Sequence, residues 1–258
     1  MSDMRKGQKI LIWGAERPTA SLLAQRYLDQ GAADVAILLD ERGVDKNMPA
    51  EVRRIDCDPA NPRQMRAFGK ELAEDKHGLD VLAIIHDETR LGYLSDNSLD
   101  DWQQSLKHNL HLVLQLSQLA YPALKLAKGN VALLGSIGGP YAYTGFGPTG
   151  VVREATHTMS RYMASEWIKD GIRVNTVAIA VIAEGETEHN ELRLLRARSL
   201  PRPDGLFPGH AHPEEIVDIF DFITSPKARW LTGQILMADG GMSLGLNFDH
   251  FLEQTNFT

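Results

Sequence analysis

The sequence has very little cysteine, no long apolar run and no excess of positive charge. Its one cysteine, Cys57, excludes an internal disulfide and is typical of a protein from a reducing compartment. The longest apolar runs, such as Val177–Ile182, are far shorter than the roughly 20 residues that cross a bilayer. A net charge of −7 excludes the basic surface that attracts nucleic acids and anionic membranes. No signal-type apolar stretch follows residues 1–9, so we expect a cytoplasmic protein without nucleic-acid or membrane partners.

Short apolar runs alternate with amphipathic stretches along the whole chain. The apolar runs are nearly continuous, which is typical of strands that are covered on both faces of a parallel sheet. We expect strands at Lys9–Trp13, Val35–Leu39, Val52–Ile55, Val81–Ile85, Val131–Leu134, Arg173–Val177 and Gln234–Met237. We expect helices at Thr19–Gln30, Pro62–Glu74, Ser98 to Gly129, Thr149–Lys169 and Pro213–Thr224.

This alternation predicts right-handed βαβ units in one α/β domain. The domain would be of Rossmann type, doubly wound around a mainly parallel seven-stranded sheet, with residues 1–258 in one unit and residues 8–243 as its core. Segment 183–212 is rich in charge, proline and glycine, which fits a substrate-type loop or a plain surface loop. The tail 244–258 carries three phenylalanines and would dock on a neighbouring subunit or pack on its own domain.

A series of landmarks follows the expected strands in a fixed order. They are Gly14 after the first strand, Asp40 after the second, Asp56 after the third, Asn109 in the long helix, Ser136 at the end of the fifth strand, and the segments Gly171–Val177 and Leu231–Gly241. Together they resemble the short-chain dehydrogenase/reductase family over residues 8–243. The resemblance implies a dinucleotide-binding fold and oxidation or reduction at an alcohol or carbonyl carbon.

The glycine-rich turn of that family is degenerate in this sequence. A dinucleotide needs glycines there, so that backbone N–H groups and a helix N-terminus approach its pyrophosphate. The three glycine positions correspond to Gly14, Pro18 and Ala20, and the proline ring adds bulk and removes a donor. The resemblance also places Asp87 where a small residue borders the cofactor, and Glu184 where a threonine contacts the nicotinamide. We expect Pro18, Asp87 and Glu184 to block the site.

Two acidic landmarks of the cofactor site survive. The resemblance places Asp40 at the adenosine ribose hydroxyls and Asp56 at the adenine, which would favour NAD over NADP in any residual binding. The alternative is that both acids serve solubility and helix capping, as acids near helix starts commonly do. With the turn altered, we expect weak binding or none, no cofactor in this chain, and Gly14 and the two acids as vestiges.

The catalytic groups of the family are replaced as well. In the family a serine polarises the substrate oxygen, and a tyrosine, whose pKa a lysine four residues later lowers, moves the proton. The register from Ser136 places the tyrosine position at Thr149 and the lysine position at Arg153. An aliphatic hydroxyl is too weak an acid for this role, and arginine does not carry a proton between groups. We therefore expect Asn109, Ser136, Thr149 and Arg153 to be vestigial and the chain to be inactive by itself.

Three functions remain open at this point. The resemblance implies a non-catalytic subunit of an NAD-dependent heterotetramer, joined through helices Asn109–Ala127 and Thr149–Lys169 to an active family member that holds the NAD. In this respect the chain is similar to the inactive subunits of family enzymes that act on a hydroxyacyl-CoA such as hydroxybenzylsuccinyl-CoA. The alternatives are an active oxidoreductase that uses Tyr141 or Tyr143, and a ligand-sensing regulatory protein. Two histidine pairs, His108 with His111 and His210 with His212, lack the acidic or cysteine partners that would complete a set of metal ligands, so no metal site is expected.

Overall fold

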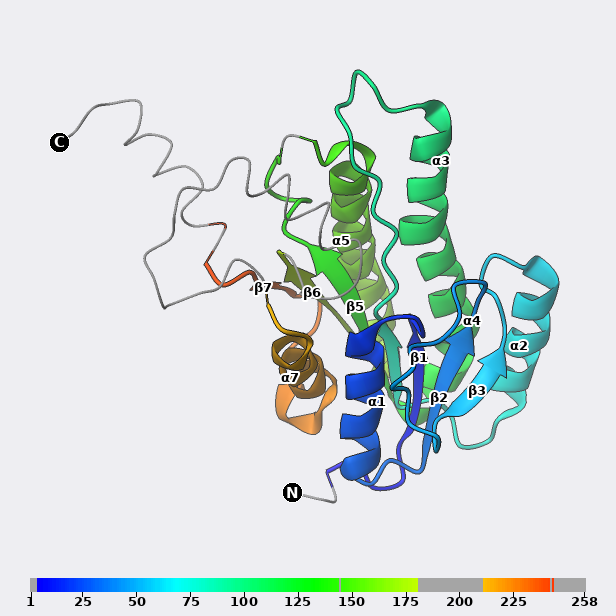
Figure 1. The fold of residues 1–258 in the computed structure, drawn as a ribbon. Helices are drawn as coiled ribbons and strands as arrows, with labels where there is room; N and C mark the ends of the chain where they lie inside the picture. The colour runs from blue at the N-terminus through cyan, green and yellow to red at the C-terminus, as the bar shows by residue number, and fades with distance from the viewer. Residues whose placement is uncertain (1–3, 144, 181–210, 242, 244–258) are drawn as a thin grey trace.

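Helices cover both faces of one parallel sheet (Figure 1). The computed structural model describes residues 4–143, 145–180, 211–241 and 243. Seven strands lie in the order β3-β2-β1-β4-β5-β6-β7. They are β1 (Lys9–Trp13), β2 (Asp34–Leu39), β3 (Arg53–Asp56), β4 (Val81–Ile84), β5 (Asn130–Ser136), β6 (Arg173–Ile179) and β7 (Ile235–Ala238). The predicted Rossmann-type α/β domain is confirmed, and the sheet is parallel throughout rather than only mainly parallel.

The helices begin where the sequence carries start signals. Proline at the first helical position starts α1 (Pro18–Asp29), α2 (Pro62–Glu74) and α7 (Pro213–Thr224), where its missing N–H costs no hydrogen bond. Ser98 and Asp101 form a capping box at the start of α3 (Leu99–Leu106). Two further long helices in the described part of the chain are α4 (Leu112–Ala127) and α5 (Gly147–Trp167), and α5 begins two residues before the predicted Thr149.

The long helix predicted from Ser98 to Gly129 is interrupted by a π-helical segment. Residues Lys107–His111, labelled η1, separate α3 from α4. Such a segment inserts an extra residue and alters local backbone hydrogen bonding, and it often occurs at functional sites. Here the carbonyl of Asn109 accepts a hydrogen bond from Thr156 Oγ1 of α5 at 2.8 Å. The insertion thus fixes Asn109 against the neighbouring helix.

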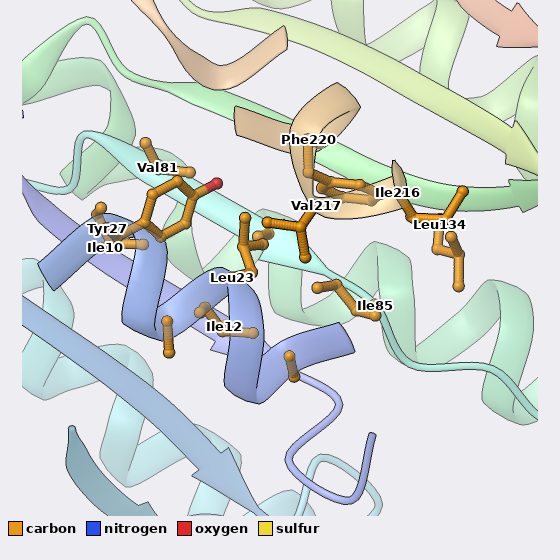
Figure 2. Packing of buried hydrophobic residues seen from close by; sticks show 14 of the residues in the cluster. Ile10, Ile12, Leu23, Tyr27, Val81, Ile85, Leu134, Ile216, Val217 and Phe220 are labelled. Atoms are coloured by element: carbon orange, nitrogen blue, oxygen red, sulfur yellow. The ribbon is translucent and has the colours of Figure 1, made fainter. Parts of the chain in front are cut away.

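Two apolar clusters fill the space between the sheet and its helices. One lies between the sheet and α1 with α7, and the other between the sheet and α2, α4 and α5. Figure 2 shows the first cluster, in which Leu23 and Tyr27 of α1 and Val217 and Phe220 of α7 pack over strand residues such as Ile12. Because burial of one such side chain is worth roughly 1.5–3 kcal/mol, these clusters supply the main driving force for the fold.

A buried arginine joins the N-terminal segment to helices α1 and α7. The Arg5 side chain is fully buried, and its Nη2 donates to Asp221 Oδ1 and Thr224 Oγ1 of α7, each at 2.8 Å. Its guanidinium carbon also lies 4.2 Å from the ring centroid of Tyr27. Arg5 Nε donates to Gln30 Oε1 at 3.0 Å. The charge of Arg5 is therefore paired and its donors are used in hydrogen bonds, as a buried charge requires.

Candidate functional site

The candidate site lies at the carboxyl ends of the central strands. Open α/β sheets bind ligands there, where neighbouring strands lead to helices on opposite faces. In this sheet β1 leads to α1 on one face, and the adjacent β4 leads toward α3 and α4 on the other (Figure 1). Gly14 after β1, Asp40 after β2, Asp87 after β4 and Ser136 at the end of β5 are therefore brought to one edge.

The turn after β1 is tightly packed against the start of the loop after β4. Gly14 has φ of +125°, and a Cβ there would lie 2.9 Å from the backbone nitrogen of His86, so only glycine fits. Pro18 then begins α1 and removes one N–H from the helix terminus that would face a pyrophosphate. The next two positions, Thr19 and Ala20, are fully buried. The turn keeps Gly14 and its close approach to the loop after β4, but Pro18 and Ala20 stand at the other two glycine positions.

The two acidic landmarks have different surroundings. Asp40 accepts from Trp13 Nε1 at 3.2 Å, and from the backbone nitrogen and Nε of Arg42 at 2.9 and 3.1 Å. Burial raises the pKa of Asp40, but the hydrogen bonds and charge of Arg42 outweigh this and hold the pKa below its ordinary value. Asp56 is exposed at the end of β3, the last residue of that strand rather than the residue after it. The carboxylate expected at a ribose is thus already occupied by side chains of the protein.

Two departures from the family pattern meet in one ion pair. Asp87, from the loop after β4, contacts the guanidinium of Arg153, which lies on α5 and is 2% exposed. Arg17 from the turn after β1 adds a second cation, with its Nη1 3.6 Å from Asp87 Oδ2. Arg153 also donates to the carbonyl of Leu134 in β5 at 3.4 Å. These contacts join α5, at the position predicted to replace the catalytic lysine, to the loop after β4, at the position predicted to border the cofactor.

The side chains at the other predicted catalytic positions form hydrogen bonds with backbone groups. Asn109 binds both backbone groups of Glu88, donating from Nδ2 at 2.7 Å and accepting at Oδ1 at 3.0 Å. Thr149 does the same for Arg90, since its hydroxyl donates to the carbonyl at 2.8 Å and accepts from the N–H at 2.7 Å. Ser136 Oγ accepts from the backbone nitrogen of Gly138 at 3.1 Å. The three polar groups therefore stabilise loops, and the only hydrogen that the Thr149 hydroxyl can donate is taken by the carbonyl of Arg90.

The alternative tyrosines lie outside helix α5. Tyr141 and Tyr143 precede its first residue, Gly147, and the residue four beyond each is a glycine with positive φ. The Tyr143 ring packs against Phe146, with 5.6 Å between ring centroids. Neither tyrosine therefore stands on the helix that carries the family's tyrosine and lysine.

Sequence reasoning missed Arg42. This residue contacts Asp40, the Nδ1 of His86 and, at 3.2 Å, Glu16 Oε1. The signal was the spacing of Arg42 two residues after Asp40, but its other partners come from two distant loops. Burial, followed by the charges of Arg42 and Arg153, holds the pKa of His86 well below its ordinary value.

Some predictions lie outside the described residues. They are Glu184, most of the segment 183–212 and the tail 244–258. Across the described segments, no helix is both long and apolar enough to span a membrane. Within the same segments, no three His, Cys, Asp or Glu side chains are grouped so as to hold a metal ion.

The residues of the edge do not match a dinucleotide site. The acceptors of Asp40 are taken by Trp13 and Arg42. The ion pair of Asp87 with Arg153 joins the loop after β4 to helix α5. Burying an ion pair is favourable only when each charge keeps its partner. A cofactor would have to displace these contacts, so we assign no chemical step to it in this chain.

Comparison with known proteins identifies the family. A family model described as enoyl-(acyl carrier protein) reductase matches residues 14–243. The chain belongs to the short-chain dehydrogenase/reductase family.

Individual relatives share this family and fold. A tropinone reductase homologue of Arabidopsis thaliana is 31% identical over 256 residues, covering 94% of this chain and 93% of that protein. A second Arabidopsis tropinone reductase homologue is 32% identical over 154 residues, which span 58% of this chain and only 56% of that relative. A 3-oxoacyl-acyl-carrier-protein reductase of Vibrio cholerae is 24% identical and covers 92% of this chain and 98% of its own length.

Solved structures show the same fold. A short-chain dehydrogenase of Leptospira borgpetersenii with bound NAD+ superposes with a TM-score of 0.78 at 22% identity, covering 92% of this chain and 93% of that chain. A short-chain type dehydrogenase/reductase of Mycobacterium ulcerans gives a TM-score of 0.78 at 18% identity, covering 99% and 96%. At such identities the likeness concerns the fold alone.

Proposed function

We propose that this chain is a non-catalytic subunit of a heteromeric NAD-dependent short-chain alcohol dehydrogenase. A second family member with an intact Tyr-x-x-x-Lys motif supplies the cofactor and the proton carrier. The observation that carries the proposal is the ion pair between Asp87 of the loop after β4 and Arg153 of α5, which occupies the predicted catalytic region with this chain's own side chains. The proposed substrate class is a hydroxyacyl-CoA such as hydroxybenzylsuccinyl-CoA.

The chemistry of the catalytic positions supports this proposal. Arginine stays protonated at any physiological pH, so Arg153 does not pass a proton to or from another group. The hydroxyl of Thr149 is an aliphatic alcohol that both donates to and accepts from the backbone of Arg90. A proton carrier needs a pKa near the working pH and a free path to the substrate oxygen. Thr149 meets neither requirement.

The partner is proposed to dock on helices Asn109–Ala127 and Thr149–Lys169. Large apolar side chains are exposed along α4, α5 and the turn that follows α5. Their exposed fractions are 58% for Leu126, 54% for Val151, 66% for Tyr162 and 50% for Ile168. Exposed apolar side chains on the two proposed docking helices support this proposal, because interfaces bury such side chains.

Co-expression with a tyrosine-intact family member tests the proposal. We expect the two chains to co-purify and to oxidise the alcohol with NAD. Replacing the partner's tyrosine by phenylalanine should abolish turnover, whereas Ser136→Ala in this chain should leave kcat within about twofold. Turnover by this chain alone, or loss of turnover in Ser136→Ala with the complex intact, would contradict a non-catalytic role.

A pair of surface variants tests the interface. Tyr162→Asp places a charge in the proposed contact and should weaken co-purification at least tenfold, because burying an unpaired carboxylate is costly. Phe222→Asp is the matched control, since Phe222 is 43% exposed on α7, which packs with α1 on the other face of the sheet from α4 and α5. Equal effects of the two variants would exclude these helices as the specific docking surface.

A further inference from the structure

Arg42 ties three loops together at the carboxyl edge of the sheet. It lies in the loop after β2, where its guanidinium contacts both carboxylate oxygens of Asp40. Its Nη1 reaches Glu16 Oε1 of the turn after β1 at 3.2 Å, and it also contacts Nδ1 of His86, from the loop after β4. One side chain thus spans the crevice between the strands at which ligands enter such sheets.

The surroundings of Arg42 are well buried. The side chain of Asp40 is 5% exposed, that of His86 is 0% exposed, and that of Arg42 itself is 26% exposed. The His86 ring stacks on Trp13 with 4.1 Å between centroids, and Trp13 in turn donates to Asp40. Arg42, Asp40, Trp13 and His86 therefore form one closed cluster, in which each side chain contacts two of the others.

Two buried polar atoms of these side chains have no hydrogen-bond partner among the described residues. They are Glu16 Oε2 and His86 Nε2. Because His86 Nδ1 faces a guanidinium, which only donates, Nε2 carries the ring proton. The cluster around Arg42 therefore has one unused acceptor, Glu16 Oε2, and one unused donor, His86 Nε2, among the described residues. Such unused groups are unusual in a purely structural cluster.

We infer that Arg42 is a built-in occupant of the adenosine half of the cleft. Its guanidinium takes the Asp40 acceptors that the ribose hydroxyls of a nucleotide would take, and it bridges loops that a bound nucleotide would otherwise bridge. The inference rests on the proposed function, because only a subunit without its own cofactor gains from such an occupant. Without Arg42, the carboxylates of Asp40 and Glu16 form a site for a ribose diol or for a small guanidinium ion.

The test compares Arg42→Ala with Arg53→Ala. Arg53 is the matched control, because it also pairs with an aspartate, Asp34 at 2.8 Å, but far from the crevice. We expect Arg42→Ala to lower the Tm by roughly 5 °C and 20 mM guanidinium chloride to restore at least half of this loss. The same concentration of sodium chloride should not restore it, and Arg53→Ala should respond to neither salt. Titration with AMP should give Arg42→Ala an affinity at least tenfold above that of the wild-type chain.

Each result decides for or against the inference. An unchanged Tm, a loss that guanidinium does not reverse, or an AMP affinity equal to the wild-type value would overturn it. Should Arg42→Ala not fold, Arg42→Gln keeps part of the aliphatic stem and gives the same readouts. Wild-type protein that binds NAD at micromolar concentration contradicts the proposed function itself, whereas silence of both wild type and variant overturns only the role of Arg42.

Discussion

Two buried arginines at opposite ends of the sheet use the same chemistry for different purposes. Arg5, at the amino end, is paired with Asp221 and surrounded by further acceptors and an aromatic ring. Arg153, at the carboxyl end, is paired with Asp87 at the position where the sequence predicts a replaced catalytic lysine. The first pair joins the N-terminal segment to α7, and the second is proposed to fill a site. The difference teaches that an ion pair is informative about function through its position rather than its geometry.

The largest expected effect comes from breaking the pair at the amino end. Arg5→Met leaves the carboxylate of Asp221 buried without its partner, so the free energy of unfolding should fall by about 4 kcal/mol. Urea denaturation followed by circular dichroism measures this change. Lys70→Met is the control, because the Lys70 and Glu74 side chains are 79% and 69% exposed and should contribute little. A loss below that of the control would show that Arg5 is not a fastener.

A smaller loss is expected at the carboxyl end. Arg153→Met should lower the free energy of unfolding by about 2 kcal/mol, less than Arg5→Met, because Asp87 is 19% exposed and Arg17 lies 3.6 Å away. The double variant Asp87→Leu with Arg153→Met should recover most of this loss, since it leaves no unpaired charge. Losses that simply add would mean that the two residues do not act as a pair.

Thr149 offers a finer test of the carboxyl end. Thr149→Val keeps the shape of the side chain but removes both hydrogen bonds to the backbone of Arg90, and should cost about 1.5 kcal/mol. Thr158→Val on the same helix is the control, because the Thr158 hydroxyl receives only an exposed arginine donor. Hydrogen exchange of the Arg90 amide should rise in the first variant and stay constant in the second. Equal exchange in both would argue against Thr149 as an anchor of this loop.

The smallest effect concerns pH. Burial and neighbouring arginines lower the pKa of His86 in the folded protein. Below pH 6.5, the ordinary pKa of histidine, the unfolded chain therefore binds a proton at this residue more readily than the folded protein does. Stability is therefore complete above pH 6.5 and is lost as the pH falls toward the folded pKa, by about 1 kcal/mol between pH 7 and 5.5. His86→Phe keeps a ring on Trp13 but does not titrate, so its unfolding free energy should depend less on pH. A slope equal to that of the wild type would assign the effect to His108 and His157, whose pKa values are also lowered.

The fold could be predicted from local patterns, whereas much of the site could not. Continuous apolar runs located the strands of the described residues to within a few residues, because these signals act over short stretches of the chain. The spacing from Ser136 predicted that Thr149 and Arg153 replace the catalytic groups. It could not predict that Arg153 meets Asp87, or that Arg42 meets His86 44 residues away, because such pairs exist only after the strand ends converge.

Equilibrium titration of the purified wild-type chain with NAD tests most directly the claim that its own side chains fill the cleft. Isothermal calorimetry at pH 7.5 should detect no binding with a Kd below about 1 mM, and 1 mM NAD should shift the Tm by less than about 1 °C. A Kd in the micromolar range, with a Tm rise of several degrees, would contradict the account.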